Sequence, residues 1–154
     1  MVSRWQEDTF VTGRNGNFDV YEANADGTDQ RNLTAGYDKN DGAPAWSPDG
    51  NNIAFVRIIQ GKEQIFLMSA DGSNLKRVTN NASNNGQPAW SPDSSKLVFQ
   101  TDRDGNFEIV VMSVDGKLTQ LTDDPGDDLD PDWSPDGTKL AFRVTAPACI
   151  TFTS

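Results

Sequence analysis

A short segment of the sequence places oxygen-bearing side chains at alternate positions, in the way that calcium-binding loops do. These side chains are Asp102, Asp104 and Asn106. Because Ca²⁺ prefers carboxylate and amide oxygens as ligands, the segment is a candidate calcium site. It lacks the full loop of an EF-hand and the glutamate that ends such a loop. The corresponding segment 13–19 has fewer acids. A polar hairpin turn without any metal is therefore the alternative interpretation.

A second group of acidic and amide side chains precedes three Pro-x-Trp segments. If these side chains converge, they would bind a cation or a basic peptide, and solvated loop charge is the alternative. The group comprises Asp38, Asn40 and Asp41, then Asn84 and Asn85, then Asp127, Asp128 and Asp130.

Most catalytic constellations are missing from the sequence. It contains no histidine and a single cysteine, Cys149, so Ser–His–Asp and Cys–His nucleophiles, histidine-ligated or cysteine-rich zinc sites and internal disulfides are excluded. There is no phosphate-binding loop and no glycine-rich dinucleotide turn. Carboxylate pairs for glycoside hydrolysis stay open, but the aspartates stand mainly at turn positions where they cap backbone groups. We predict that the chain is not an enzyme and has no catalytic residue or obligatory cofactor.

The charge balance restricts the partners. The 154 residues carry a formal net charge of −10. Nucleic acids and anionic membranes bind Lys and Arg clusters, so neither is an expected partner. No stretch approaches the roughly 18 apolar residues of a membrane span, and the N-terminus has no apolar signal core. A basic protein, a cation or a polar ligand would be attracted, although solubility alone would also explain the charge.

The elements that would position these side chains form a repeat. The string Ala-Trp-Ser-Pro-Asp-Gly at 45–50 returns at 89–94, with serine last, and as Asp-Trp-Ser-Pro-Asp-Gly at 132–137. Asp-Gly pairs, Leu-Thr or Val-Thr pairs and a phenylalanine nine residues after each tryptophan follow the same period of about 44. A period of this length is typical of propellers and other repeat folds.

Each unit is predicted to form four short strands. In the unit of Trp90, the first two are 88–90 and 96–100, joined by a Ser-Pro-Asp turn of type I that tolerates serine at its fourth position. The third strand, 108–113, contains the continuous apolar run 109–112, which indicates burial on both faces. The fourth, 119–122, is the weakest. We therefore predict an all-β fold of four-stranded antiparallel propeller blades.

The repeated aromatic residues are predicted to be structural anchors between blades, with a stacking role for the tryptophans as the alternative. They are Trp46, Trp90, Trp133, Phe55, Phe99 and Phe142.

These motifs resemble the TolB-type, WD-repeat-like β-propeller family, over roughly residues 9–143. The resemblance implies that the loops before each Pro-x-Trp strand gather at the mouth of a central channel. It also implies a non-enzymatic module that binds a protein or peptide through the acidic loops there. The alternatives are the regulatory propeller of a prolyl-oligopeptidase-type peptidase and a calcium-stabilised structural scaffold. A periplasmic or extracytoplasmic bacterial location follows from the resemblance alone.

The number of units is smaller than the six to eight blades of rings in this family. We expect one partial propeller domain over 1–154, truncated relative to the family, with about 3.5 blades. Blade 1, about 8–35, lacks its first strand; blade 2 is about 43–79, blade 3 about 87–122, and a partial blade 4 about 130–154. An open arc exposes apolar blade faces and unpaired strand edges. We therefore expect a homodimer that closes one ring.

Overall fold

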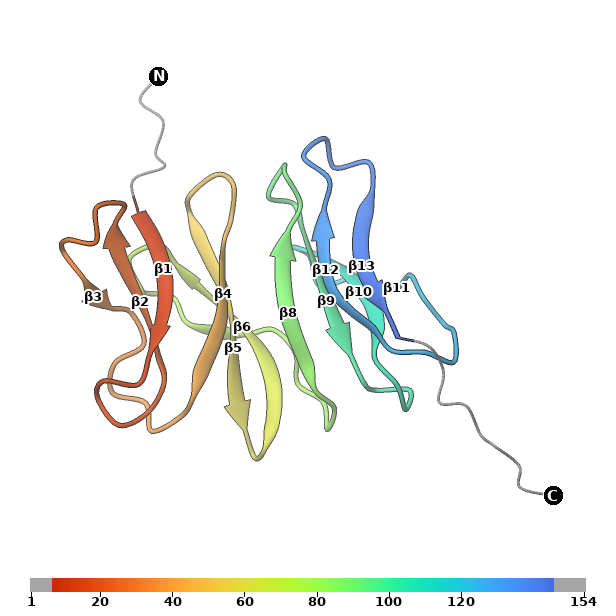
Figure 1. The fold of residues 1–154 in the computed structure, drawn as a ribbon, viewed down its shortest axis with the longest axis horizontal. Helices are drawn as coiled ribbons and strands as arrows, with labels where there is room; N and C mark the ends of the chain where they lie inside the picture. Colours follow the sequence, from red (N-terminus) through yellow and green to blue (C-terminus); the bar gives the residue numbers. More distant parts are fainter. Residues whose placement is uncertain (1–6, 146–154) are drawn as a thin grey trace.

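The computed structural model describes residues 7–145, and all regular structure in this range is antiparallel β-sheet (Figure 1). No helix in this range could cross a membrane. The strands are β1 (Glu7–Thr12), β2 (Asp19–Asn24), β3 (Arg31–Asn32), β4 (Asp41–Trp46), β5 (Asn52–Ile59), β6 (Lys62–Ser69), β7 (Lys76–Arg77), β8 (Asn85–Trp90), β9 (Lys96–Thr101), β10 (Glu108–Ser113), β11 (Leu118–Gln120), β12 (Asp128–Trp133) and β13 (Leu140–Val144).

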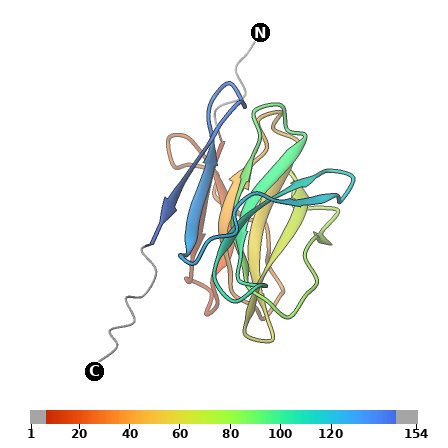
Figure 2. The same ribbon diagram turned by 90° about the vertical axis from the view of Figure 1, so that its right-hand side faces the viewer.

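The strands form four sheets, which are the propeller blades predicted from the repeat. The sheet orders are β1-β2-β3, β4-β5-β6-β7, β8-β9-β10-β11 and β12-β13 within the described residues. The blades stand side by side as a fan in Figures 1 and 2, with β4, β8 and β12 along the near edge in Figure 1. This edge is where a propeller has its central channel. The part of the predicted blade 4 beyond residue 145 lies outside the described residues.

The first strand of each complete blade is longer than the Pro-x-Trp motif alone. In blade 3 it begins at Asn85, three residues before Pro88. The register between β8 and β9 shifts between Gly86 and Ala89, and Gln87 inside the shift has φ +52°. Ala43 and Asp130 hold the same place before Pro44 and Pro131, with φ +46° and +54°. The bulge accommodates a proline, which cannot donate a hydrogen bond, and the strands pair again on both sides of it.

The hydrophobic core lies between blades. One cluster joins Ala54 and Ile65 of blade 2 to Trp90, Phe99 and Met112 of blade 3, among others. A second cluster packs Val20 of blade 1 against apolar residues of β5 and β6, including Phe55 and Phe66. Because a middle blade contributes to both clusters, its central strands are apolar on both faces. Ile109 and Val110 of β10 are buried, as the continuous apolar run predicts.

The Ser-Pro-Asp turns join the first two strands of each blade. The hydroxyls of Ser47, Ser91 and Ser134 donate to the aspartates two residues later, at 2.5–2.6 Å. The last residue of the turn has a left-handed backbone in each case, with φ +70° at Gly50, +59° at Ser94 and +69° at Gly137. Serine at position 94 is therefore expected to be less favourable than glycine, since this backbone region favours glycine. Its hydroxyl accepts a hydrogen bond from the Asp49 backbone N–H of blade 2, at 3.0 Å.

Candidate functional site

One end of the fan gathers the loops that connect successive blades. Segments 33–40, 78–84 and 121–127 link the fourth strand of one blade to the first strand of the next. They lie at the lower edge in Figure 1, beside the hairpins that join strands two and three. We call this edge the linker-loop end. The acidic and amide residues predicted to line a channel mouth lie in these loops or just after them.

Three of the predicted binding residues hold the loops in place. The side-chain oxygens of Asn40, Asn84 and Asp127 accept hydrogen bonds from backbone N–H groups of the neighbouring hairpins, at 2.9–3.2 Å. The N–H groups belong to Phe18, Glu63 and Phe107 in turn. The three contacts repeat from blade to blade, so these side chains fix the loop geometry.

The next residue in each loop is buried. Asp41 is 3% exposed and accepts two hydrogen bonds from Arg57, both at 2.6 Å. The Arg57 guanidinium also lies over the Tyr37 ring, 4.3 Å from its centroid. At the equivalent position Asn85 exchanges hydrogen bonds with Asn81, and its amide donates at 2.8 Å. Asp41 and Asn85 are therefore occupied by internal partners.

Asp128 holds the same position in blade 4 and is fully buried. Neither of its carboxylate oxygens has a hydrogen-bond partner within residues 7–145. Burial raises the pKa of Asp128, and the charges of Asp124 and Glu108 raise it further, while the Thr122 hydroxyl acts in the opposite direction. In blade 2, Arg57 stands opposite Asp41 and pairs with it. In blade 4, Val144 stands opposite Asp128, so no cation occupies the equivalent position.

Asp38 and Asp130 remain exposed. Asp130 lies in the bulge before Pro131 and pairs with the exposed Arg143 at 3.2 Å. Its backbone N–H donates to the Gln100 side chain of blade 3 at 2.8 Å. The structure thus brings the predicted residues to one region. Among them, only Asp38 and Asp130 have carboxylates that face solvent and neither cap a hairpin nor lie buried.

The predicted calcium ligands bind other groups. The Asp102 carboxylate accepts hydrogen bonds from the backbone and side chain of Asn84, at 2.7 and 2.6 Å. Asp104 pairs with Arg103 at 3.0 Å. The Asn106 side-chain amide donates to Glu108 at 2.7 Å and to two carbonyls of the following linker loop, those of Asp124 and Gly126. Across the described part of the chain, no group of three or more acidic, histidine or cysteine side chains is arranged to hold a metal ion.

An apolar patch at the linker-loop end was not anticipated from the repeat. Phe18 is 55% exposed and Tyr37 48%. The Phe18 backbone N–H donates to Asn40 at 3.1 Å, and the side chain of the preceding Asn17 donates to the Tyr37 carbonyl at 3.1 Å, so Phe18 and Tyr37 border one loop. We call Phe18 and Tyr37 the aromatic patch. The signal in the sequence is that Phe18 occupies the hairpin position where blade 2 has Glu63.

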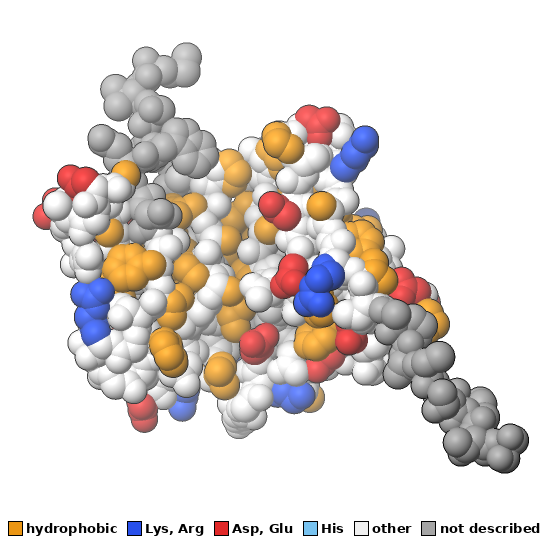
Figure 3. Space-filling view, viewed as in Figure 1, with side chains coloured by type: hydrophobic (Ala, Val, Ile, Leu, Met, Phe, Trp, Pro, Cys, Tyr) orange, Lys and Arg blue, Asp and Glu red, His pale blue; other side chains and the backbone are white. Residues whose placement is uncertain are grey.

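The channel-side face of the fan has two unlike halves. In Figure 3 hydrophobic side chains spread over the β1 and β4 side, whereas the acidic side chains lie mainly toward β8 and β12. Apolar surface and negative charge are thus both available on one face.

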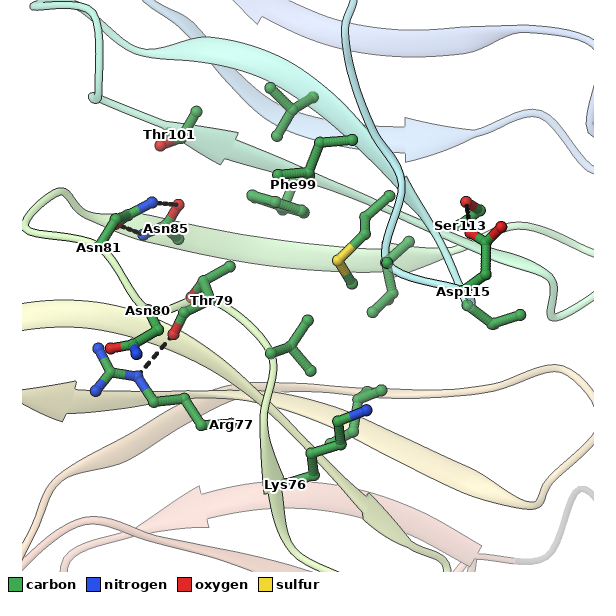
Figure 4. A pocket seen from close by; sticks show the side chains of 18 of the residues that line it. Lys76, Arg77, Thr79, Asn80, Asn81, Asn85, Phe99, Thr101, Ser113 and Asp115 are labelled. Atoms are coloured by element: carbon green, nitrogen blue, oxygen red, sulfur yellow. Dashed lines mark hydrogen bonds between the residues drawn. The ribbon is translucent and has the colours of Figure 1, made fainter.

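A cleft of about 370 Å³ opens between the outer parts of blades 2 and 3 (Figure 4). Its walls come from β6 and β7 on one side and from β8–β11 on the other. It lies away from the linker-loop residues predicted to bind a partner, apart from Asn85, which lines one end.

The comparisons with known proteins agree with this architecture. The family described as the TolB beta propeller domain matches residues 76–146. An uncharacterized protein of Agrobacterium fabrum is 40% identical over 65 residues, which are 42% of this chain and 22% of that protein.

Solved structures are similar over nearly the whole chain. TolB from Acinetobacter baumannii matches with a TM-score of 0.81 and 26% identity, over 94% of this chain and 36% of that one. A candidate TolB from Agrobacterium tumefaciens matches with a TM-score of 0.83 and 26% identity, over 96% of this chain and 53% of that one. A prolyl endopeptidase matches at 0.69 with 18% identity, over 90% of this chain and 24% of that one, which shows a shared fold alone.

This chain therefore spans about a fifth to a half of the length of these three relatives. The repeated motifs, the four-stranded blades and the similarity to TolB structures lead to one conclusion: the chain is built from TolB-type β-propeller repeats.

Proposed function

We propose that the chain is a non-enzymatic module that binds a protein or peptide at its linker-loop end. The observation that carries the proposal is the aromatic patch, Phe18 and Tyr37, exposed beside the carboxylate of Asp38. Exposed aromatic residues are typical of interface centres, where they bury a large area with few rotatable bonds. The net charge of −10 favours a partner with a basic surface.

The loops that carry this surface are held in place before any partner arrives. Asn17 donates its side-chain amide to the carbonyls of Tyr37 and Lys39, at 3.1 and 2.8 Å. The buried Arg57 guanidinium stacks on the Tyr37 ring, 4.3 Å from its centroid. A surface that is ordered in advance loses less conformational entropy on binding, which supports its use as a recognition site.

Selection from a displayed library of random peptides tests this proposal with the intact chain. We expect the selected peptides to be rich in Lys, Arg and apolar residues. Their affinity should fall about tenfold in the double variant Phe18→Ser with Asp38→Asn, which is about 1.4 kcal/mol. The matched control is Lys139→Ala, an exposed residue next to the turn at the opposite end. Equal affinity of the double variant and the control would contradict the proposal.

A second copy of this chain is a further proposed partner, because the outer face of the last described blade is bare. Phe142 is 40% exposed, although the equivalent Phe55 and Phe99 are 0% and 1% exposed. Val144 on the same strand is also exposed. Two copies would form one ring of about six to eight blades.

The mass in solution tests this second proposal. Sedimentation equilibrium should give twice the chain mass of 16.8 kDa at micromolar concentration. The variant Phe142→Ser with Val144→Ser should shift the equilibrium to the monomer, whereas Val114→Ser, at another exposed apolar position, should not. A stable monomer at every concentration would overturn the homodimer.

A further inference from the structure

The cleft between blades 2 and 3 has the composition of a ligand site. Its floor is apolar and includes Trp90, Phe99, Val110 and Met112. Its volume of about 370 Å³ is within the range of small-molecule sites. None of its lining residues belongs to the aromatic patch, so the cleft is a second candidate site beside the one proposed for a protein or peptide.

The cleft is open because blade 3 has a shorter outer hairpin. Between its Asp-Gly pair and its Leu-Thr pair, blade 3 has one residue fewer than blade 2. In blade 2 this hairpin places Leu75 against the core between blades 1 and 2. The equivalent Leu118 is instead 49% exposed at the cleft. Figure 2 shows the β10–β11 hairpin projecting outward from the fan.

The two ends of the cleft carry different polar side chains. Figure 4 shows Arg77, Asn80, Asn81 and Thr101 at one end, and Ser113 and Asp115 at the other. The Arg77 Nε donates to the Thr79 carbonyl at 2.7 Å, which holds the guanidinium beside the cleft and leaves its other N–H groups available. Thr101 is 1% exposed, and its hydroxyl has no hydrogen-bond partner within the described chain.

The charge at the cleft is opposite to that of the chain. Lys76, Arg77 and Arg103 line it, against the single carboxylate of Asp115. The Asp115 carboxylate already accepts hydrogen bonds from Ser113 and from the Lys117 backbone N–H. Arg103 is paired with Asp104, so Lys76 and Arg77 supply the uncompensated charge. The cleft therefore favours an anion, whereas the protein as a whole favours cations.

We propose that this cleft binds a small amphipathic carboxylate. The carboxylate lies at the end with Arg77 and Thr101, where the Arg77 guanidinium and the Thr101 hydroxyl donate to it and Lys76 adds positive charge. The apolar chain lies over Phe99, Val110 and Met112. A medium-length alkyl chain matches both the volume and the apolar floor.

Nuclear magnetic resonance with ¹⁵N-labelled full-length chain and decanoate tests this site. We expect saturable amide shifts confined to residues that line the cleft, on β7, β9 and β10. Arg77→Gln should weaken decanoate binding about tenfold or more, because a charge-assisted hydrogen bond is lost. Decanol, with the same chain and no charge, should bind far more weakly.

The controls separate this site from unspecific binding. Lys139→Gln removes a cation far from the cleft and should leave decanoate binding unchanged, and the amide spectrum of each variant reports its fold. The variant Lys76→Glu gives a second test that does not disturb the Arg77 hydrogen bond, and it should also weaken binding. Equal binding of decanol and decanoate, or shifts confined to the bare face around Phe142, would overturn the proposal.

Discussion

At the scale of single residues, one repeated position gives a buried polar side chain a different environment in each of three blades. Asp41, Asn85 and Asp128 are all buried at the start of a first strand. Arg57 neutralises Asp41, and an amide pair satisfies Asn85, but Asp128 has Val144 opposite. A buried carboxylate without a partner is costly, and the second strand of blade 4 offers Asp128 no cation to offset that cost.

Val144→Arg should repair this position. The register is the same as in blade 2, so the new guanidinium can reach Asp128. We expect the free energy of unfolding at neutral pH to rise by about 1 kcal/mol, measured by urea denaturation. In the background of Asp128→Asn the gain should disappear, since that variant removes the charge. A gain of equal size in both backgrounds would show that the arginine acts through another contact.

The turn aspartates predict how stability depends on pH. Hydrogen bonds from the Ser91 and Ser134 hydroxyls, and from the backbone N–H groups of Ser95 and Thr138, lower the pKa of Asp93 and Asp136 to about 2 from an ordinary 3.8. A carboxyl with a lowered pKa stabilises the fold above 3.8, and this stability is lost as the pH falls toward 2.

The double variant Asp93→Asn with Asp136→Asn should therefore lose less stability than the wild type between about pH 5 and pH 2. Urea midpoints across this window measure the effect.

Asp128→Asn provides a contrast of opposite sign. Because the pKa of Asp128 is raised, its ionisation costs stability as the pH rises above 3.8, and the variant should remove that cost. Parallel curves for the wild type and the turn variant would contradict the assignment.

At the scale of elements, the outer hairpins decide how tightly neighbouring blades meet. The longer hairpin of blade 2 turns through Asn74, with φ +56°, and its Gly72 lies close to the Leu33 backbone of blade 1. Arg31 of blade 1 donates to the Asp71 carbonyl in the same contact, at 3.2 Å. The hairpin of blade 3 is one residue shorter, and the cleft occupies the equivalent place.

Replacing Lys117 by the two residues Ser-Asn should give blade 3 the hairpin of blade 2. We expect Leu118 to turn inward and the cleft to close. Stability should rise by about 1 kcal/mol from the buried leucine surface. Decanoate binding should be lost at the same time, and urea denaturation with amide shifts would measure both effects. Lys117→Asn, without the added residue, is the control and should leave the cleft open. Retained decanoate binding in the lengthened hairpin would contradict this account of the cleft.

At the scale of the whole molecule, the core exists only where two blades face each other. Phe55 and Phe99 are buried between blades, whereas Phe142, at the same repeat position, is bare on one side. Identical residue types in identical motifs thus contribute very differently to stability.

Phe99→Ala should cost about 3–5 kcal/mol, the usual range for a fully buried phenylalanine. Phe142→Ala should cost about 1 kcal/mol or less in dilute solution, because much of its surface is already in water. Thermal or urea unfolding of the two variants compares them directly. If a second copy covers this face, the cost of Phe142→Ala will grow with protein concentration. Equal costs at low concentration would show that Phe142 is buried in the monomer.

The strands, their order within a blade and the apolar middle strands were all predictable, because each depends on local periodicity and turn chemistry that recur with every repeat. The first strands were predicted too short, because the bulge before proline interrupts the alternation of inward and outward side chains by which a strand is recognised. The predicted channel-mouth residues do gather at one end. Their internal partners, such as Phe18 for Asn40, lie about 20 residues away in the sequence and could not be deduced from the loops themselves.

The repeat is sufficient to identify a run of TolB-type blades, because four motifs recur with one period and each specifies a strand or a turn. Which polar side chains are exposed depends instead on the packing of the blades. Asp127 caps a hairpin, Asp128 is buried and Asp38 is exposed, although all three occur in similar acidic loops. The cleft, too, depends on the fit between two blades. Burial and hydrogen bonding are properties of the packed neighbours, which sequence spacing does not specify.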